Sequence, residues 1–185
     1  DIKQTPKYSM RTLAFHEAIP GHHLQNALNL ENEELTLYRR FGYYTSAFGE
    51  GWALYSERLS VELGMAKTLF DELGVLQSEL FRSVRLVVDT GLHYKRWTRE
   101  EAMDYMKKTT GMSDTEVMAE IERYIVWPGQ ACSYKVGMIK ILDLRERAKD
   151  QIGDSFDIRD FHSAVLDHGE PPLFIVEELV DEMIG

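Results

Sequence analysis

The chain has few of the residues that would place it in several common protein classes. It has one cysteine, Cys132, in 185 residues, which excludes an internal disulfide and a zinc site built from several thiolates. Lysine and arginine number 21 against 31 acidic residues, so the formal net charge is -10 and no nucleic-acid partner is expected. No apolar run approaches the roughly 20 residues that a membrane-spanning helix needs.

The alternation of polar and apolar residues that marks half-buried strands is almost absent, so the predicted fold class is all-α. Residues 1–7 are expected to form a loop, and no internal repeat divides the chain, which suggests one domain over residues 1–185. Helices are predicted over residues 8–30 with an interruption near Pro20, and over 46–64, 67–94, 98–111, 113–125, 133–149, 158–167 and after Pro172. The clearest pattern comes from apolar residues at three- and four-residue steps, namely Leu69, Leu73, Leu76, Leu80, Val84 and Val87.

The segment FHEAIPGHHLQ, residues 15–25, holds three of the six histidines. It begins like the HExxH motif of zinc peptidases, in which two histidines four residues apart face one way and the glutamate beside the first reaches the metal-bound water. Four positions after His16, however, stands Pro20, which cannot bind a metal and lacks the N–H that would bond back to position 16. The helix is therefore predicted to bulge or kink, with Gly21 tolerating the unusual backbone angles.

This interruption bears on which histidine is the second ligand. If two residues are looped out, His22 returns to the place of the second histidine of the motif. In an undistorted helix the competing candidate, His23, lies seven residues after His16, roughly 10 Å along the axis. The pattern predicts His16 and His22 as metal ligands and Glu17 as the general base, with His23 as the alternative ligand.

A zinc ion held by two histidines usually takes a carboxylate as its third protein ligand. The segment EGWALYSE offers Glu50 and Glu57, seven residues and two helical turns apart. Both cannot reach one ion from a straight helix, so one should bind the metal and the other should orient a histidine or a water. Taken alone, the pair is equally compatible with a solvated helix face. His162 and His168 are expected to be structural or simply exposed.

Within residues 67–94, four polar residues recur on one face of the predicted helix: Arg82, Arg85, Asp89 and His93. His93 is predicted to reach the oxyanion of the transition state, oriented by Asp89, while Arg82 or Arg85 pairs with a substrate carboxylate or an acidic partner. The alternative is an exposed stripe of salt bridges. Tyr134, after the helix-breaking WPGQ, is a second candidate for the oxyanion.

Four ordered motifs, TLAFHEAIPGHHLQ, GEGWALYSERL, RLVVDTGLHYKRWTREEA and PGQACSYKVG, resemble the bacterial family known as domain of unknown function 885, whose members look like relatives of gluzincin metallopeptidases. The resemblance runs from about Tyr8 to the C-terminus. It implies a zincin-like catalytic domain at the C-terminal end of a longer, mostly helical protein, whose N-terminal region would be a partner. Similarity to thimet-type oligopeptidases, in spacing and in tyrosines that follow the metal helices, favours Glu50 as the ligand, Glu57 as its support and Tyr134 in catalysis. The reverse assignment of the two glutamates stays open.

The resulting hypothesis is a hydrolase with one zinc ion that cleaves peptides or small amides. Two alternatives remain: a helical binding or scaffold module with an empty or inactive metal site, and a metal-dependent hydrolase of non-peptide amides or esters. No signal peptide opens these residues. The compartment stays open between the cytoplasm and the cell envelope, where the protein could be a lipoprotein.

Overall fold

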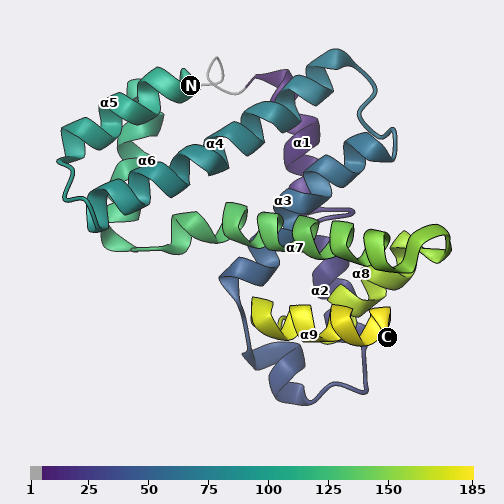
Figure 1. Ribbon diagram of the computed structural model, residues 1–185. Helices are drawn as coiled ribbons and strands as arrows, with labels where there is room; N and C mark the ends of the chain where they lie inside the picture. The colour runs from purple at the N-terminus through teal and green to yellow at the C-terminus, as the bar shows by residue number, and fades with distance from the viewer. Residues whose placement is uncertain (1–5) are drawn as a thin grey trace.

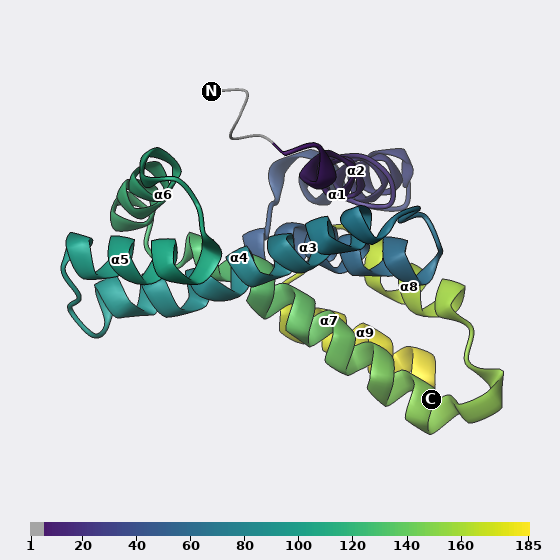
Figure 2. The same ribbon diagram turned by 90° about the horizontal axis from the view of Figure 1, so that it is seen from above.

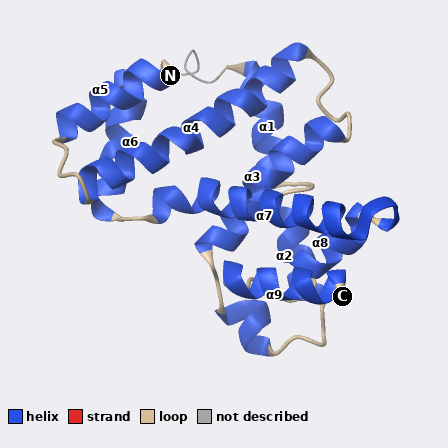
Figure 3. Cartoon of the chain, viewed as in Figure 1, coloured by secondary structure: helices blue, strands red, loops and turns tan. Residues whose placement is uncertain are grey.

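The computed structural model describes residues 6–185, and over this range the chain is helical and contains no strand (Figures 1 and 3). The all-α prediction is therefore confirmed, whereas positions 1–5 of the loop predicted at the start lie outside the described residues. The helices are α1 (Lys7–Glu17), α2 (His22–Glu31), α3 (Ser46–Glu62), α4 (Leu69–His93), α5 (Arg99–Thr110), α6 (Asp114–Val126), α7 (Gln130–Ile152), α8 (Ile158–Leu166) and α9 (Leu173–Ile184), with short turns η2 (Tyr38–Gly42) and η3 (Gly153–Ser155).

Local sequence sets several of the helix ends. Thr98 and Ser113 begin α5 and α6, and each forms a capping box with the glutamate three residues on. Gly111 ends α5 with φ 71°, a left-handed conformation that glycine adopts without a steric penalty. These ends agree with the prediction for residues 98–111 and 113–125. By contrast, α7 begins three residues earlier than predicted, at Gln130.

The centre of the molecule is the crossing of α3 and α7 (Figure 1). Two glycines let the helices touch through their backbones: a Cβ on Gly51 would lie 2.5 Å from Gly137 Cα, and a Cβ on Gly137 would overlap the carbonyl oxygen of Ala47. Around this contact α3 is buried on nearly every side, since Phe48 and Trp52 are at most 1% exposed. The helix that carries Glu50 and Glu57 is therefore held rigidly in the core.

Two hydrophobic cores lie on either side of this crossing. One joins α3 and α7 to α8 and α9, and the other joins α4 to α5, α6 and the start of α7. Figures 1 and 2 show α5 and α6 against one half of α4, while α1 lies at its other half and also contacts α3. Helix α1, which carries His16, is thus placed against the helix that carries the two glutamates.

Helix α4 exposes much of its apolar face and buries part of its polar face, the reverse of what its sequence pattern suggests. The leucine repeat that predicts the helix lies largely in solvent; Leu76, for example, is 64% exposed. The polar stripe turns inward, and Arg85 and Asp89 are each only 4% exposed. An exposed stripe of salt bridges is therefore wrong for these two residues. Buried charges of this kind are stable only when they are paired, and the partners are described below.

Candidate metal centre

The HE…GHH segment forms the end of one helix and the start of the next. Helix α1 ends at Glu17 and α2 begins at His22, with a cis peptide bond between Ile19 and Pro20 in the connecting turn. Instead of the predicted bulge or kink within one helix, the structure has two separate helices. Gly21 has φ -77° and ψ -135°, a combination outside both the helical and the extended regions, so the unusual backbone angles predicted for it are present. A Cβ there would overlap the carbonyl oxygen of His16, so the close approach of the two helices requires glycine.

Helix α3 holds this break in place from the other side. The indole nitrogen of Trp52 donates to the carbonyl oxygen of Pro20 at 2.9 Å, and the hydroxyl of Ser56 donates to the same oxygen at 3.2 Å. Both donors are buried, so these hydrogen bonds have no water competing for them. The turn that separates the two histidines is thus fixed to the helix that carries the carboxylates.

Three side chains meet at this junction: His16, His22 and Glu50. Oε2 of Glu50 lies 3.2 Å from Nε2 of His22 and 3.6 Å from Nε2 of His16, and all three potential ligand atoms lie within 4.8 Å of one another. Two zinc ligands with bonds of 2.0–2.1 Å in a tetrahedral arrangement lie about 3.3 Å apart. The two distances to Glu50 are close to this spacing, and two imidazoles with one carboxylate are donors that zinc takes, so the residues present fit a zinc ion.

Glu57 occupies the other nitrogen of His16. Its Oε1 lies 2.7 Å from Nδ1 of His16, and both side chains are at most 3% exposed. A carboxylate at Nδ1 favours the tautomer with the proton on that nitrogen, which leaves Nε2 free to bind a metal. Arg82 stands behind the carboxylate, with its guanidinium 3.9 Å from Oε1. The two glutamates therefore divide as the spacing favours, with Glu50 beside the histidine nitrogens and Glu57 behind one of them.

Neighbouring side chains shift the pKa values of Glu50 and His16. Burial raises the pKa of the Glu50 carboxyl, but hydrogen bonds with His16 and His22 outweigh this and hold it well below its usual range. Burial lowers the pKa of His16, while hydrogen bonds with Glu50 and Glu57 raise it further than burial lowers it. Glu50 is therefore an anion, the state in which a carboxylate binds a metal.

Glu17 and His23 lie outside this cluster. Glu17 is the last residue of α1 and is exposed, and His23 is exposed in the first turn of α2. Neither belongs to the group of closely spaced potential ligands found among residues 6–185. The structure thus brings His22 rather than His23 to His16 and Glu50.

His93 and Asp89 have contacts of their own near the turn before α7. Nε2 of His93 lies 3.0 Å from the carbonyl oxygen of Tyr124, and both carboxylate oxygens of Asp89 accept from the backbone N–H of Gly129, at 3.0 and 3.2 Å. Asp89 therefore fixes the WPGQ turn, and no hydrogen bond or ion pair joins it to His93 among the described side chains. That turn sets the start of α7 and hence the position of Tyr134.

Tyr134 lies between the candidate ligands and the buried arginines. Its ring stacks on that of His16, with centroids 6.2 Å apart and planes inclined by 19°. The guanidinium of Arg85 lies 4.7 Å from the centre of the same ring. Arg85 also donates to the Tyr124 hydroxyl and to Glu120, both at 2.9 Å. Arg85 is therefore occupied by internal partners.

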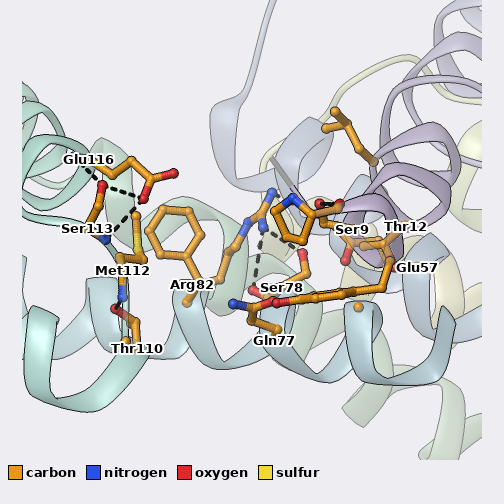
Figure 4. Close-up of a pocket in the computed structure, with 16 residues that line it drawn as sticks. Ser9, Thr12, Glu57, Gln77, Ser78, Arg82, Thr110, Met112, Ser113 and Glu116 are labelled. Carbon is orange, nitrogen blue, oxygen red and sulfur yellow. Dashed lines mark hydrogen bonds and ion pairs between the residues drawn. The ribbon is translucent and has the colours of Figure 1, made fainter. Parts of the chain in front are cut away.

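A cavity of about 720 Å³ opens between α1, α4 and the turn between α5 and α6 (Figure 4). Glu57 and Arg82 line one end of it, and Ser113 and Glu116 the other. None of the three candidate ligands contributes to its lining. The cavity therefore reaches the support behind His16 rather than the face where a metal would bind.

The structure also adds side chains that the sequence patterns did not single out. The hydroxyl of Tyr44 lies 3.5 Å from Oε1 of Glu50, the oxygen turned away from the histidines. Glu170, 6% exposed, accepts from the side-chain amide of Gln25 and from the backbone N–H of Thr45, and so ties α2 to the start of α3. Tyr44 precedes the candidate ligand Glu50 by six residues and Glu170 follows it by 120, so no periodic sequence pattern connects either residue with Glu50.

An all-helical fold with a two-histidine, one-carboxylate cluster defines the chain as a helical protein with a candidate mononuclear metal centre. The chain belongs to the family described as "Bacterial protein of unknown function (DUF885)", whose model matches residues 1–180. No curated protein matches it. Within the described residues, none of the helices is both long enough and apolar enough to cross a membrane.

Two solved structures are similar to this chain. One is "the putative lipoprotein from Colwellia psychrerythraea", 55% identical over 100% of this chain with a TM-score of 0.96. The other is "a putative lipoprotein of unknown function from Shewanella oneidensis", 29% identical over 94% of this chain with a TM-score of 0.86. The chain spans only 32% and 31% of the length of these two proteins.

Proposed function

We propose that the chain is the catalytic part of a zinc-dependent peptidase related to the gluzincins. The observation that supports this most directly is the junction of α1, α2 and α3, where Oε2 of Glu50 lies 3.2 and 3.6 Å from the Nε2 atoms of His22 and His16. These spacings are close to those of tetrahedral zinc ligands, and His16 is held by a buried hydrogen bond with Glu57. His16, His22 and Glu50 would hold the ion.

The chain's own groups would share the work of hydrolysis. Glu57 orients His16 through the 2.7 Å contact at Nδ1 and, in the neutral ring, favours the tautomer whose Nε2 can bind a metal. A zinc ion bound here would supply Lewis acidity, lowering the pKa of a water and polarising the scissile carbonyl. Glu17, next to His16 and open to solvent, would take a proton from the attacking water and deliver it to the leaving amine.

Tyr134 remains a candidate for stabilising the oxyanion because its ring packs on His16. A single donor to the oxyanion contributes about 3 kcal/mol. His93 carries the same proposed role with less support, since its Nε2 already contacts the Tyr124 carbonyl oxygen. Arg82 is similarly occupied, because it donates to Ser78 and faces Glu57.

Metal analysis and a peptide digest test this proposal. The purified protein should bind one zinc ion and cleave members of a peptide library only when zinc is present. Glu17→Gln should keep the zinc and lose about 10²–10⁴-fold in turnover, the usual contribution of a general base. Hydrolysis by that variant at the parental rate would show that Glu17 is not the base.

Two neighbouring substitutions provide a matched control for the ligands. His22→Ala removes one of the three donors and should abolish stoichiometric zinc binding, whereas His23→Ala changes an exposed residue and should not. Equal zinc loss in both variants would contradict the ligand set. A folded, metal-free protein that binds a partner would favour the scaffold alternative, and cleavage of esters or non-peptide amides alone would favour the other hydrolase.

The compartment and the partner are also proposals. The two structural relatives are described as lipoproteins, which supports a location in the bacterial cell envelope. Those relatives are about three times as long as this chain, and the exposed leucines of α4 offer an apolar face for further residues of a longer protein. A preceding N-terminal region is therefore the proposed partner.

A further inference from the structure

A polar cluster lies beside the proposed metal ligands, on the side of Glu50 that faces away from the two histidines. We call it the Arg123 cluster; it consists of Tyr44, Ser46, Arg123 and Gln130. Arg123 donates to Oε1 of Gln130 at 2.8 Å, and Nε2 of Gln130 donates to the Ser46 hydroxyl at 3.4 Å. Tyr44 completes the cluster through its hydroxyl, which lies 3.5 Å from Oε1 of Glu50.

The cluster is one helical turn away from a proposed ligand. Ser46 precedes Glu50 by four residues on α3, so the two share a face and are separated by about 6 Å along the axis. From the other side, Arg123 reaches the hydroxyl of Tyr134 at 3.5 Å, and the Tyr134 ring stacks on His16. The Arg123 cluster is therefore within reach of anything bound at His16, His22 and Glu50.

Arg123 also carries positive charge that its neighbours neutralise only in part, because it shares its acidic partner with Arg85. Glu120 pairs with Arg85 at 2.9 Å and accepts from the Tyr124 hydroxyl at 2.5 Å, while it lies 3.7 Å from Arg123. One carboxylate thus serves two guanidinium groups. The side chain of Arg123 is 34% exposed, against 5% for Arg85, so the surplus charge faces outward at Arg123.

We propose that the Arg123 cluster binds the free C-terminal carboxylate of a peptide substrate. A guanidinium fork beside an amide and two hydroxyls matches the planar shape and acceptor atoms of a carboxylate. One residue of extended chain spans about 3.5 Å. A scissile carbonyl at the three ligands therefore places the terminal carboxylate at Arg123 when one or two residues follow the cleaved bond.

This inference rests on the proposed peptidase function and names its substrate class: the enzyme removes one or two residues from the C-terminal end. The chemistry is ordinary hydrolysis. The water oxygen forms the new C–O bond, the C–N bond breaks, and a proton passes to the leaving amine, so no further reactant is needed. Arg123 replaces the buried Arg82 and Arg85 as the residue that receives the substrate carboxylate.

The kinetic test compares N-acetyl-tetraalanine carrying a free carboxylate with the same peptide carrying a C-terminal amide, using the zinc-loaded protein. We expect kcat/KM to be about 10–100-fold higher for the acid, the range of one charge-assisted hydrogen bond. Arg123→Gln should lower kcat/KM for the acid by a similar factor, mainly through KM, and bring the acid-to-amide ratio close to one. Arg123→Lys, which keeps the charge but not the fork, should restore part of the ratio.

Arg99 provides the matched control. Its side chain is 35% exposed, nearly the same as that of Arg123, and it donates to Glu122 at 2.6 Å. Arg99→Gln should therefore keep the full acid-to-amide ratio. An equal kcat/KM for acid and amide in the parent, or an unchanged ratio in Arg123→Gln, would overturn the carboxylate site and leave the peptidase proposal intact.

A binding measurement separates this inference from the failure of the peptidase proposal. Calorimetry would use ketomethylene isosteres of acetyl-dialanine, which cannot be hydrolysed, with a terminal carboxylate or a terminal amide. If neither tetraalanine peptide is cleaved, the peptidase proposal fails. The affinities of the two isosteres then show whether the Arg123 cluster binds a carboxylate. Tighter binding of the acid that is lost in Arg123→Gln supports the carboxylate site, and equal affinities overturn it.

Discussion

Helices α3 and α4 flank the candidate metal centre and differ in how much of their apolar surface the rest of the chain covers. Helix α3 is surrounded by the core, and of residues 48–57 only Glu50 is partly exposed. Helix α4 has the more regular apolar repeat, yet it turns Leu76 to solvent and Arg85 inward. A regular apolar stripe therefore predicts that a helix forms, but does not establish which face the rest of the chain covers.

The difference follows from what each helix packs against. Helix α3 crosses α7 at two glycines, so the backbones touch and side chains fill the space on every side. Helix α4 shares a hydrophobic core with α5 and α6 but also meets polar partners, because Glu57 of α3 and Glu120 of α6 both lie where arginines of α4 can reach them. Charges buried together in this way tend to specify a particular arrangement more than they add stability. Four substitutions or conditions would test this contrast.

The largest effect is expected at the α3–α7 crossing. Gly137→Ala places a methyl group onto the carbonyl oxygen of Ala47, so the two helices must move apart along their whole contact. We expect a loss of about 3 kcal/mol in the free energy of unfolding, at the upper end for an overpacked core. Urea denaturation measures it, with Val136→Ala, at a 46% exposed position of α7, as the control. A Gly137→Ala protein as stable as the parent would contradict the close approach.

The next effect concerns the polar face of α4. Arg85→Leu leaves the Tyr124 hydroxyl without its cation and the Glu120 carboxylate without the closer of its two cations. It should cost about 2–3 kcal/mol, reduced from the fully buried case because Glu120 is 21% exposed and keeps Arg123 at 3.7 Å. The matched change at the exposed pair, Arg99→Leu, should leave the urea midpoint nearly unchanged. If both variants behave alike, the buried stripe of α4 is not structurally important.

An acid-dependent effect is expected on the α3 side. The hydroxyl of Tyr55 donates to Nε2 of His162 at 2.8 Å, and burial lowers the pKa of His162 to about 4. In the unfolded chain His162 binds a proton near its usual pKa of about 6.5, whereas in the folded chain it does so only near pH 4. The contribution of His162 to the free energy of unfolding is therefore fully present above pH 6.5 and is lost as the pH drops toward 4. The loss should be about 1–3 kcal/mol.

His162→Gln cannot be protonated and isolates this contribution. Urea midpoints at pH 7 and pH 4.5 should differ less in the variant than in the parent, even if the variant is less stable at both. An identical pH dependence of the two proteins would show that His162 does not titrate in this range.

The smallest effect is expected on the leucine face of α4. Leu76→Ala changes a 64% exposed side chain and should alter the free energy of unfolding by less than about 0.5 kcal/mol. The same substitution at Leu54 of α3, which is 1% exposed, should cost about 2–5 kcal/mol. Comparable losses at the two positions would mean that the contrast between α3 and α4 is smaller than the structure indicates.

Prediction from the sequence worked where the signal was local. The Thr98 and Ser113 caps set the starts of α5 and α6. The HE…GHH pattern selected His16 and His22, which the structure brings together, because histidine spacing and the helix-breaking Pro-Gly can both be read within eight residues. It worked less well where a side chain's role depends on distant partners. His93 was expected at the site, yet its nearest polar contact is the carbonyl oxygen of Tyr124, which only the packing of α4 on α6 brings there.

The amino-acid sequence by itself determined that the chain is helical, where most helices begin and end, and which short segments carry side chains able to bind a metal. Tertiary structure alone decided that Glu50 faces both histidines, that Glu57 stands behind His16, and that Tyr44, Arg123 and Gln130 gather beside them. The physical reason is one of range. Caps and breaks depend on hydrogen bonds within a few residues, whereas the site depends on helices from distant parts of the chain crossing at glycine contacts that no local pattern encodes.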